Sequence, residues 1–229
     1  LDTLALSNNK FDGIVPVTQL AKTTLKYLSL SGNGFSGMLE HSITLMKTIE
    51  HMYLDGNKLK GPIPTEISSL TNLKSLDLGS NQFTGTVPSE IGALLRLEFL
   101  SMQSNKLQGT LPRELGLLTN LKGLNFASNE LAGTIPNISN MLRLVNLQLF
   151  ENEFTGSIPE AVQQLQSIEI VSLASNKLDG TIPRSISRLS RTLRGLYLSD
   201  NKIQGRIPTD LCKFSSLEAL FLDTNDLFG

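Results

Sequence analysis

The chain has 229 residues, of which 40% are hydrophobic and 6% aromatic, and its 20 Lys and Arg nearly balance its 21 Asp and Glu. This balance argues against a polybasic nucleic-acid binder or a membrane-surface module, and no apolar run approaches the roughly 20 residues that span a bilayer. The single cysteine excludes an internal disulfide framework and a cysteine-rich zinc site.

An asparagine recurs along the whole chain at a nearly constant interval of roughly 24 residues, with one interval slightly shorter and one slightly longer. The residues before it follow the pattern apolar-x-x-apolar-x-apolar-x-x-Asn, as in Leu73, Leu76 and Leu78 before Asn81. Ten such units in register predict a leucine-rich repeat array. The recurring positions are Asn9, Asn33, Asn57, Asn81, Asn105, Asn129, Asn152, Asn176, Asn201 and Asn225.

Each apolar-x-apolar step predicts a short strand with one buried face, and the ten strands are expected to stack into one parallel sheet. A strand this short cannot bury enough apolar area alone, so neighbouring units must supply the core. The asparagine lies where the chain turns inward. Its amide is expected to pair with turn N–H and C=O groups that would cost about 1–3 kcal/mol each if buried unpaired.

The return segment of each unit carries a second apolar residue, a glycine and an apolar-Pro step, as in Phe83, Gly85 and Pro88. Glycine at this position suggests a tight bend, and proline fits an edge or a turn. Three irregularities follow in chain order: Glu40 replaces the proline of unit two, the return 136–139 is one residue short, and the return 190–192 has one extra residue. The two changes in length are expected on the convex return, where they disturb the sheet least.

The repeated motif Leu-x-Gly-x-Ile-Pro, at 131–136 and 178–183, resembles the plant-type leucine-rich repeat family. Members of that family include ectodomains of receptor-like kinases and receptor-like proteins and secreted polygalacturonase inhibitors, and similar arrays occur in secreted algal proteins. The resemblance implies an α/β solenoid: a right-handed superhelix of ten repeats of about 24 residues each, with a parallel concave sheet and short convex strands or 3-10 turns. It also implies an extracellular or cell-surface, non-catalytic binding role without a cofactor, and a co-receptor as a further partner.

The chain departs from the family pattern at its ends. Family arrays usually carry paired-cysteine caps, and this chain has none; it starts in phase at Leu1 and stops at Gly229 within the tenth unit. Uncapped solenoid ends expose apolar core and strand edges. We therefore expect residues 1–229 to be one array from the interior of a longer protein.

No catalytic or metal-binding grouping can be placed by spacing. His41 is expected on the convex return and His51 on the concave strand, which separates the only two histidines. Cys212 follows a proline in a return and is expected to be a small buried residue. Asp55 and Asp77 lie on adjacent strands, but glycosidase chemistry would need a deep pocket to desolvate one of them. The sequence therefore predicts no enzyme.

The outward positions of the concave strands have no core role, so large residues there suggest ligand contacts. Aromatic side chains flanked by polar groups suit peptide or sugar recognition, although scattered apolar residues on a surface need no explanation. One group lies on units two to five, a second on units seven to ten, and small residues separate them. The candidates are Tyr27, His51, Tyr53, Asp55, Asp77 and Phe99, then Asn125, then Phe150, Tyr197, Phe221 and Asp223.

Two further surface features are expected away from this face. The sequon Asn137-Ile138-Ser139 lies on a return and is a glycosylation candidate, and the basic residues from Arg184 to Lys213 fit a solvated convex face. The favoured function is recognition of a peptide, protein or cell-wall glycan, with no nucleic acid and no membrane insertion. The alternatives are a structural or adhesive wall or matrix protein, and an inhibitor of a wall-degrading enzyme.

Overall fold

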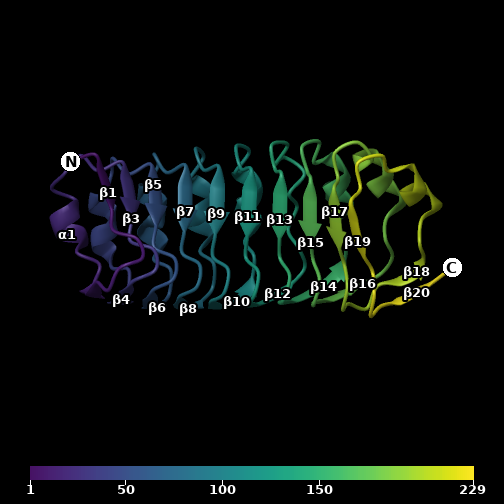
Figure 1. The fold of residues 1–229 in the computed structure, drawn as a ribbon, viewed down its shortest axis with the longest axis horizontal. Coiled ribbons are helices and arrows are strands. Elements are labelled where there is room, and N and C mark those ends of the chain that lie inside the picture. The colour runs from purple at the N-terminus through teal and green to yellow at the C-terminus, as the bar shows by residue number, and fades with distance from the viewer.

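The apolar-x-apolar steps form ten three-residue strands in a computed structural model that describes residues 1–229 (Figure 1). All ten pair in parallel in one sheet, and each pairing joins equivalent positions of successive units, such as Leu76 with Leu100. The strands are β1 (Thr3–Ala5), β3 (Tyr27–Ser29), β5 (His51–Tyr53), β7 (Ser75–Asp77), β9 (Phe99–Ser101), β11 (Gly123–Asn125), β13 (Asn146–Gln148), β15 (Ile170–Ser172), β17 (Gly195–Tyr197) and β19 (Ala219–Phe221).

A second set of parallel strands covers the segment after each recurring asparagine, as expected near the Gly-x-apolar-Pro step. Eight of them form one sheet and the last two a separate pair. The eight are β2 (Asp12–Ile14), β4 (Gly34–Gly37), β6 (Lys58–Gly61), β8 (Gln82–Gly85), β10 (Lys106–Thr110), β12 (Glu130–Gly133), β14 (Glu153–Ser157) and β16 (Lys177–Asp179), and the pair is β18 (Gln204–Arg206) and β20 (Asp226–Phe228).

Short helices complete the returns, and most begin directly after the proline of the apolar-Pro step. The proline ring fixes its own backbone torsion and the residue needs no hydrogen-bond partner for its nitrogen, which suits a helix start. The helices are α1 (Val17–Leu20) and the 3-10 helices η1 (His41–Leu45), η2 (Thr65–Ser69), η3 (Ser89–Ala93), η4 (Arg113–Leu117), η5 (Glu160–Gln164), η6 (Arg184–Leu189) and η7 (Thr209–Lys213).

The irregular units differ only in their returns. No helix forms between β12 and β13, where the return is one residue short, and η6 is one residue longer than the other 3-10 helices. Glu40 stands directly before η1 with an extended backbone, so this helix starts without proline. The ten-stranded sheet runs through all three places without interruption.

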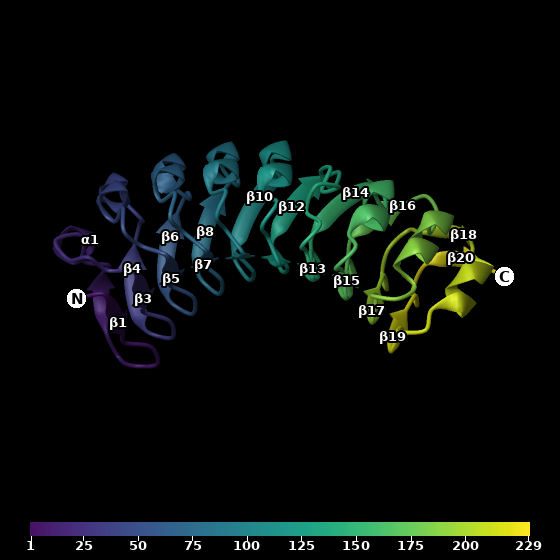
Figure 2. The ribbon, with the colours of Figure 1, turned by 90° about the horizontal axis from the view of Figure 1, so that it is seen from above.

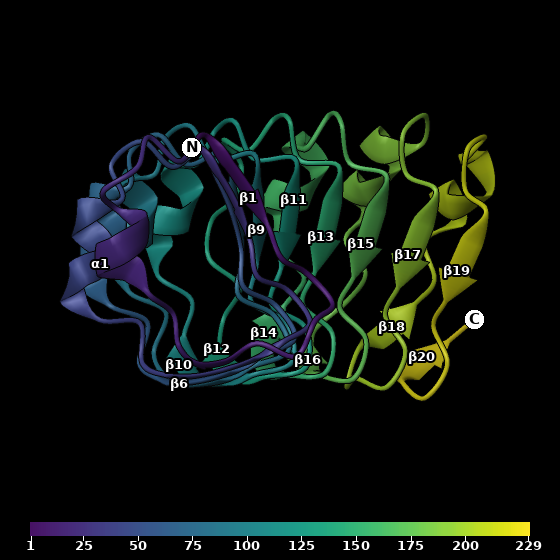
Figure 3. The same cartoon turned by 60° about the vertical axis from the view of Figure 1, so that its left-hand side comes forward.

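Seen from above, the array is an arc with the ten-stranded sheet along its inner side and the short helices along its outer side (Figure 2). The second strands lie between them, and in an oblique view successive units are rotated relative to one another, which gives the solenoid its twist (Figure 3). The large sheet is therefore the concave face, and the outward side chains of its strands share one surface.

The core is a single continuous cluster of 55 buried residues that runs the length of the arc. Leucine and isoleucine fill most of it, and the largest fully buried side chains are Phe83, Phe126 and Phe154. Phe11 is an exception in the second apolar row: it is 44% exposed and stacks on Phe35 with ring centroids 6.2 Å apart. The core thus forms between units rather than within any one of them.

The recurring asparagines tie each unit to the one before it. Asn152 is typical: its Nδ2 donates to the carbonyls of Leu149 (3.2 Å), Phe150 (3.2 Å) and, in the previous unit, Phe126 (2.9 Å). Its Oδ1 accepts from the backbone N–H of Leu131, also in the previous unit, at 3.0 Å. Four backbone groups of a buried turn are therefore satisfied by one side chain.

The residue before each of these asparagines adopts the left-handed backbone region. Two units have glycine there, Gly32 and Gly56, and the other eight have residues such as Ser128 at φ 55° and Glu151 at φ 54°. This conformation costs an L-residue roughly 1–2 kcal/mol. The asparagine hydrogen bonds therefore hold a turn that most of these residues would not adopt alone.

Replacing Asn152 by alanine is expected to lower the free energy of unfolding by about 3 kcal/mol, because buried N–H and C=O groups lose their partner. Urea unfolding followed by far-UV circular dichroism measures this. Asn140→Ala is the matched control, since Asn140 is exposed. Equal midpoints for the two variants would contradict a structural role for the asparagine.

Candidate ligand-binding face

The eleven candidate residues all lie on the concave face, either in a strand of the large sheet or two residues after one. The middle residue of each strand faces the core, as Leu76 and Leu100 do, and most of the residues on both sides of it remain accessible, whereas Ser29 and Ser75 are buried. All three tyrosines of the chain are among the accessible ones: Tyr27, Tyr53 and Tyr197. The concave face thus carries every tyrosine of the chain, whereas the exposed Phe11 and Phe228 lie elsewhere.

The first group forms a compact aromatic cluster on β3 and β5. The ring of Tyr27 lies 6.1 Å from that of His51 and 5.6 Å from that of Tyr53, and the rings of His51 and Tyr53 stack with centroids 6.5 Å apart. His51 is fixed further by a contact of 3.0 Å between its Nδ1 and the Ser75 hydroxyl. Mutual contact holds these rings in place before any ligand arrives.

A hollow of about 440 Å³ opens beside this cluster, across β5 to β13. Tyr53 and Phe99 form aromatic parts of its wall, and Phe99 is 49% exposed. A Cβ added to Gly123 would lie 3.0 Å from the Phe99 ring, so glycine leaves room for that ring. The polar lining residues are Asp77, Ser101, Asn125, Asn146 and Gln148.

Asp77 is the carboxylate of this hollow. Burial raises its pKa, and the nearby charge of Asp55 raises the pKa further. The hydrogen bond that the Gly79 N–H donates to Oδ1 at 2.9 Å acts in the opposite direction. Neither aspartate takes part in any ion pair; Asp55 accepts a hydrogen bond from Ser31 instead. Asp77 is therefore a partly desolvated carboxylate without a cationic partner.

The second group is smaller than the sequence suggests. Tyr197 and Phe221 stack with ring centroids 5.3 Å apart, and Ser199 donates a hydrogen bond to the adjacent Asp223. Phe150 follows β13 and makes no ring contact with them. Three of the four expected residues are thus together, and Phe150 lies between the two groups.

The structure adds residues that the sequence reasoning left out of the candidate set. Asn146 and Gln148 line the first hollow together with Asn125, because they lie on the neighbouring strand β13 in the same outward rows. Asn125 therefore belongs to the first group rather than to a separate floor. The repeat spacing alone could have identified Asn146 and Gln148, because equivalent positions of successive repeats are neighbours in space.

A ladder of charges along one lateral edge was also missed. The residues before the concave strands alternate in charge except at Val145, and their ion pairs include Lys74 with Glu50 at 2.6 Å and Lys122 with Glu98 at 2.7 Å. Hydrogen bonds from these lysines lower the pKa values of Glu50 and Glu98. The row is Asp2, Lys26, Glu50, Lys74, Glu98, Lys122, Val145, Glu169, Arg194 and Glu218.

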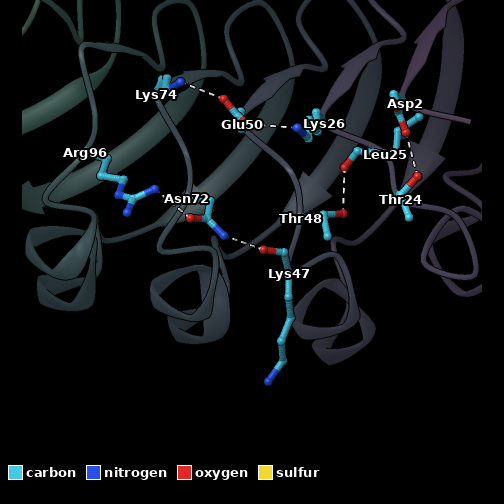
Figure 4. Close-up of polar contacts among 10 residues, drawn as sticks. All are labelled: Asp2, Thr24, Leu25, Lys26, Lys47, Thr48, Glu50, Asn72, Lys74 and Arg96. Atoms are coloured by element: carbon cyan, nitrogen blue, oxygen red, sulfur yellow. Dashed lines mark hydrogen bonds and ion pairs between the residues drawn. The ribbon is translucent and has the colours of Figure 1, made fainter.

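A second polar row runs beside this ladder and binds backbone carbonyls of the preceding unit (Figure 4). Thr48 donates to the carbonyl of Leu25 at 2.8 Å, and Asn72 to that of Lys47 at 2.9 Å. Arg96 then donates to the side chain of Asn72. These contacts occupy the N-terminal part of the edge, whereas towards the C-terminus it opens into a hollow of about 690 Å³ lined mostly by polar residues such as Glu169, Arg194 and Glu218. That hollow has no aromatic side chain in its wall, which leaves the concave face as the better candidate for a ligand.

The remaining candidate residues lie outside this face. Asn137 is exposed on the convex return, and its Oδ1 accepts a hydrogen bond from the Ser139 N–H at 3.0 Å. His41 pairs with Glu66 at 2.9 Å in the convex helices. No group of three or more His, Cys, Asp or Glu side chains has the arrangement of a metal site, and no helix is long and apolar enough to cross a membrane.

The expectation that Cys212 is buried is wrong, because its side chain is exposed. The equivalent residues of η3 and η4 are Gly92 and Gly116, and a Cβ on Gly92 would lie 2.6 Å from the Glu114 carbonyl of the next unit. In η7 no further helix packs against this position, so the cysteine faces solvent.

Comparisons with known proteins agree with the repeat pattern. The family "Leucine Rich Repeat" matches residues 24–46, 48–70, 72–94, 96–118, 167–189 and 192–214, more than half of the chain. The chain therefore belongs to the leucine-rich repeat family. No curated protein sequence matches it.

Solved structures place it within the plant type of that family. It is similar to a TDR receptor (33% identity, TM-score 0.96, covering 99% of this chain and 39% of that one). It is also similar to the Arabidopsis receptor kinase HAESA, solved with the peptide hormone IDA and the co-receptor SERK1 (32%, 0.94, 98% and 38%). A plant ice-binding protein is a further neighbour (26%, 0.82, 100% and 74%). The chain thus spans about two fifths of the two receptor chains.

Replacing Asp77 by asparagine is expected to stabilise the fold at neutral pH. The folded pKa of Asp77 is raised above its ordinary value of 3.8, so ionisation opposes folding, and stability falls as pH rises through the raised pKa. The gain from Asp77→Asn is therefore present at pH 7 and disappears below the ordinary value. Thermal unfolding midpoints between pH 3 and pH 7 measure it.

Glu98→Gln is the control of opposite sign. The pKa of Glu98 is lowered by Lys122, so its ionised form supports folding above its ordinary value of 4.5, and this support is lost as pH falls through the lowered pKa. The variant should be less stable than the parent at pH 7 and equal to it at low pH.

A destabilising effect of Asp77→Asn at pH 7 would contradict the prediction for Asp77, because it would show that the charge of Asp77 has a structural partner.

Proposed function

We propose that this chain is a ligand-recognition segment of an extracellular plant-type receptor domain and that it binds an extended peptide along its concave face. The proposal rests on two groups of side chains on the concave face, each of which combines aromatic rings with a carboxylate. One group contains Tyr53 and Asp77, and the other contains Tyr197 and Asp223. The similarity to HAESA, whose structure includes a peptide hormone, supports the choice of a peptide.

The length of the face suits an extended chain. Asp77 is on β7 and Phe221 on β19, six strand steps apart in the sheet order. At about 4.8 Å per step the span is about 29 Å, which an extended peptide of about nine residues covers at about 3.3 Å per residue. Small side chains such as Ser172 and Ala174 lie between the two groups and leave a path for the backbone.

The rigidity of the array favours this mode of binding. Each strand is held by its neighbours and by the asparagine side chains, so the concave side chains need little ordering when a ligand binds. The aromatic rings are already in contact with one another, and such rings lose little entropy on burial. Aromatic anchors at the two ends of the face would supply most of the affinity.

Peptide binding is tested with an array of random nonapeptides, followed by solution affinities for the peptides retained. Tyr53→Ala and Tyr197→Ala should each weaken binding by at least tenfold, because each removes an aromatic anchor. Phe228→Ala is the matched control: Phe228 is 61% exposed and lies in β20, outside the concave sheet.

Three outcomes would oppose the proposal. Loss of affinity in Phe228→Ala to the same extent would indicate general destabilisation. Concentration-dependent self-association with no retained peptide would favour a structural or adhesive role. Inhibition of a polygalacturonase without peptide binding would favour an inhibitor, which the fold alone does not separate from a receptor.

Passage through the secretory pathway gives a separate test. Asn137 is exposed and belongs to the only sequon, so expression in plant cells with a signal peptide should add one N-glycan. Endoglycosidase treatment should shift the mobility of the protein, and Asn137→Gln should abolish the shift. A parent protein that reaches the medium without the shift would contradict glycosylation at this residue.

A further inference from the structure

The concave face carries negative charge only. Its accessible rows consist of the first and third residues of each large-sheet strand and the residue two positions after the strand. None of the 20 Lys and Arg occupies these rows, whereas Asp55, Asp77 and Asp223 do. The whole chain has a net charge of −1, so its basic residues are all displaced to the edges and the convex side.

Asp77 differs from the paired carboxylates of the lateral edge. Glu50, Glu98 and Glu218 each have a lysine or arginine within 2.7 Å. Asp77 is half-buried, has no such partner, and lines an open hollow. A desolvated carboxylate without a cation is unfavourable in the free protein, and the hydrogen bond that Asp77 accepts comes from a neutral group, the N–H of Gly79. The fold therefore gains little from this charge.

The surroundings of Asp77 match a cationic side chain. Tyr53 is its direct neighbour on β5. On β9 its direct neighbour is Ser101, and Phe99 lies two residues before Ser101; Tyr53 and Phe99 both line the same hollow. The faces of aromatic rings attract cations within about 6 Å. The amide oxygens of Asn146 and Gln148 at the far wall can accept the remaining N–H groups of a guanidinium or ammonium.

We propose that the hollow between Tyr53 and Phe99 receives a lysine or arginine side chain of the bound peptide, with Asp77 as its ionic partner. The proposal rests on the peptide-binding function and names the chemistry of one ligand residue. A planar guanidinium can form two hydrogen bonds with the carboxylate while it stacks on a ring, so arginine fits better than lysine. The negative concave face would also attract a basic peptide over a distance.

The test uses four sets of synthetic nonapeptides that are random except at one fixed position, which holds arginine, lysine, citrulline or glutamate. Citrulline keeps the shape of arginine without its charge. Binding to the protein is measured in solution at low and physiological salt. The arginine set should bind at least tenfold more tightly than the citrulline set, and the glutamate set should bind most weakly.

Asp77→Asn should reduce the ratio of arginine to citrulline affinity to about one, while the affinity for the citrulline set stays near that of the parent. Phe99→Leu should reduce the ratio in part. Asp179→Asn, an exposed aspartate on the convex strand β16, is the matched control and should leave the ratio unchanged. Because Asp77→Asn should also be the more stable protein, unfolding would not explain its loss of preference.

The outcomes separate this inference from the function on which it rests. Tight binding of peptides with equal affinity for arginine and citrulline would overturn the cation site and leave peptide recognition standing. An arginine preference that survives in Asp77→Asn would assign the cation to another carboxylate and overturn the proposal. Failure of all four peptide sets, with or without binding of neutral oligosaccharides, would overturn both.

Discussion

The hydrogen bonds of one asparagine side chain per unit are the constraint on which the rest of the structure depends. From Asn33 onwards each amide bridges two successive turns: it donates to carbonyls of both units and accepts an N–H from the earlier one, as Asn57 does with Leu30, Leu54 and Phe35. A single residue thereby fixes the distance between units at the end of each strand. The parallel register of the concave sheet follows, because equivalent residues must then lie side by side.

This fixed point explains where the array tolerates irregularity. The unit that is one residue short and the unit that is one residue longer both keep their asparagine bonds, through Asn152 and Asn201. The change in length is absorbed in the return, as a missing helix in one case and a longer η6 in the other. The second strands are less continuous than the concave sheet: their eight-stranded sheet ends at β16, and β18 pairs only with β20. The concave face, which lies next to the asparagines, keeps one continuous surface.

The period of the sequence was sufficient to predict most of the fold but only part of the candidate site. The spacing of Leu76, Leu78 and Asn81 predicted the strand, the turn and the position of Asp77 on the concave face, because each depends on residues close in sequence. The hollow beside Phe99 depends on side chains from five strands and on the missing Cβ of Gly123. A hollow formed by several units cannot be recognised from the sequence of one repeat. The burial of Cys212 was predicted incorrectly for a related reason, because it depends on whether a neighbouring helix packs against η7.

The repeat separates residues that hold the array from residues that are free to vary, and this gives Asp77 its significance. Core leucines, turn asparagines and the paired charges of the lateral edge each have a partner within the chain, so their identity follows from the fold. A concave position accepts serine or alanine in other units, as at Ser101 and Ala5. A half-buried carboxylate at such a position disfavours the folded state. Residues that lower stability without a structural role tend to lie where a ligand is bound, and Asp77, which lines an open hollow together with Tyr53 and Phe99, meets that description.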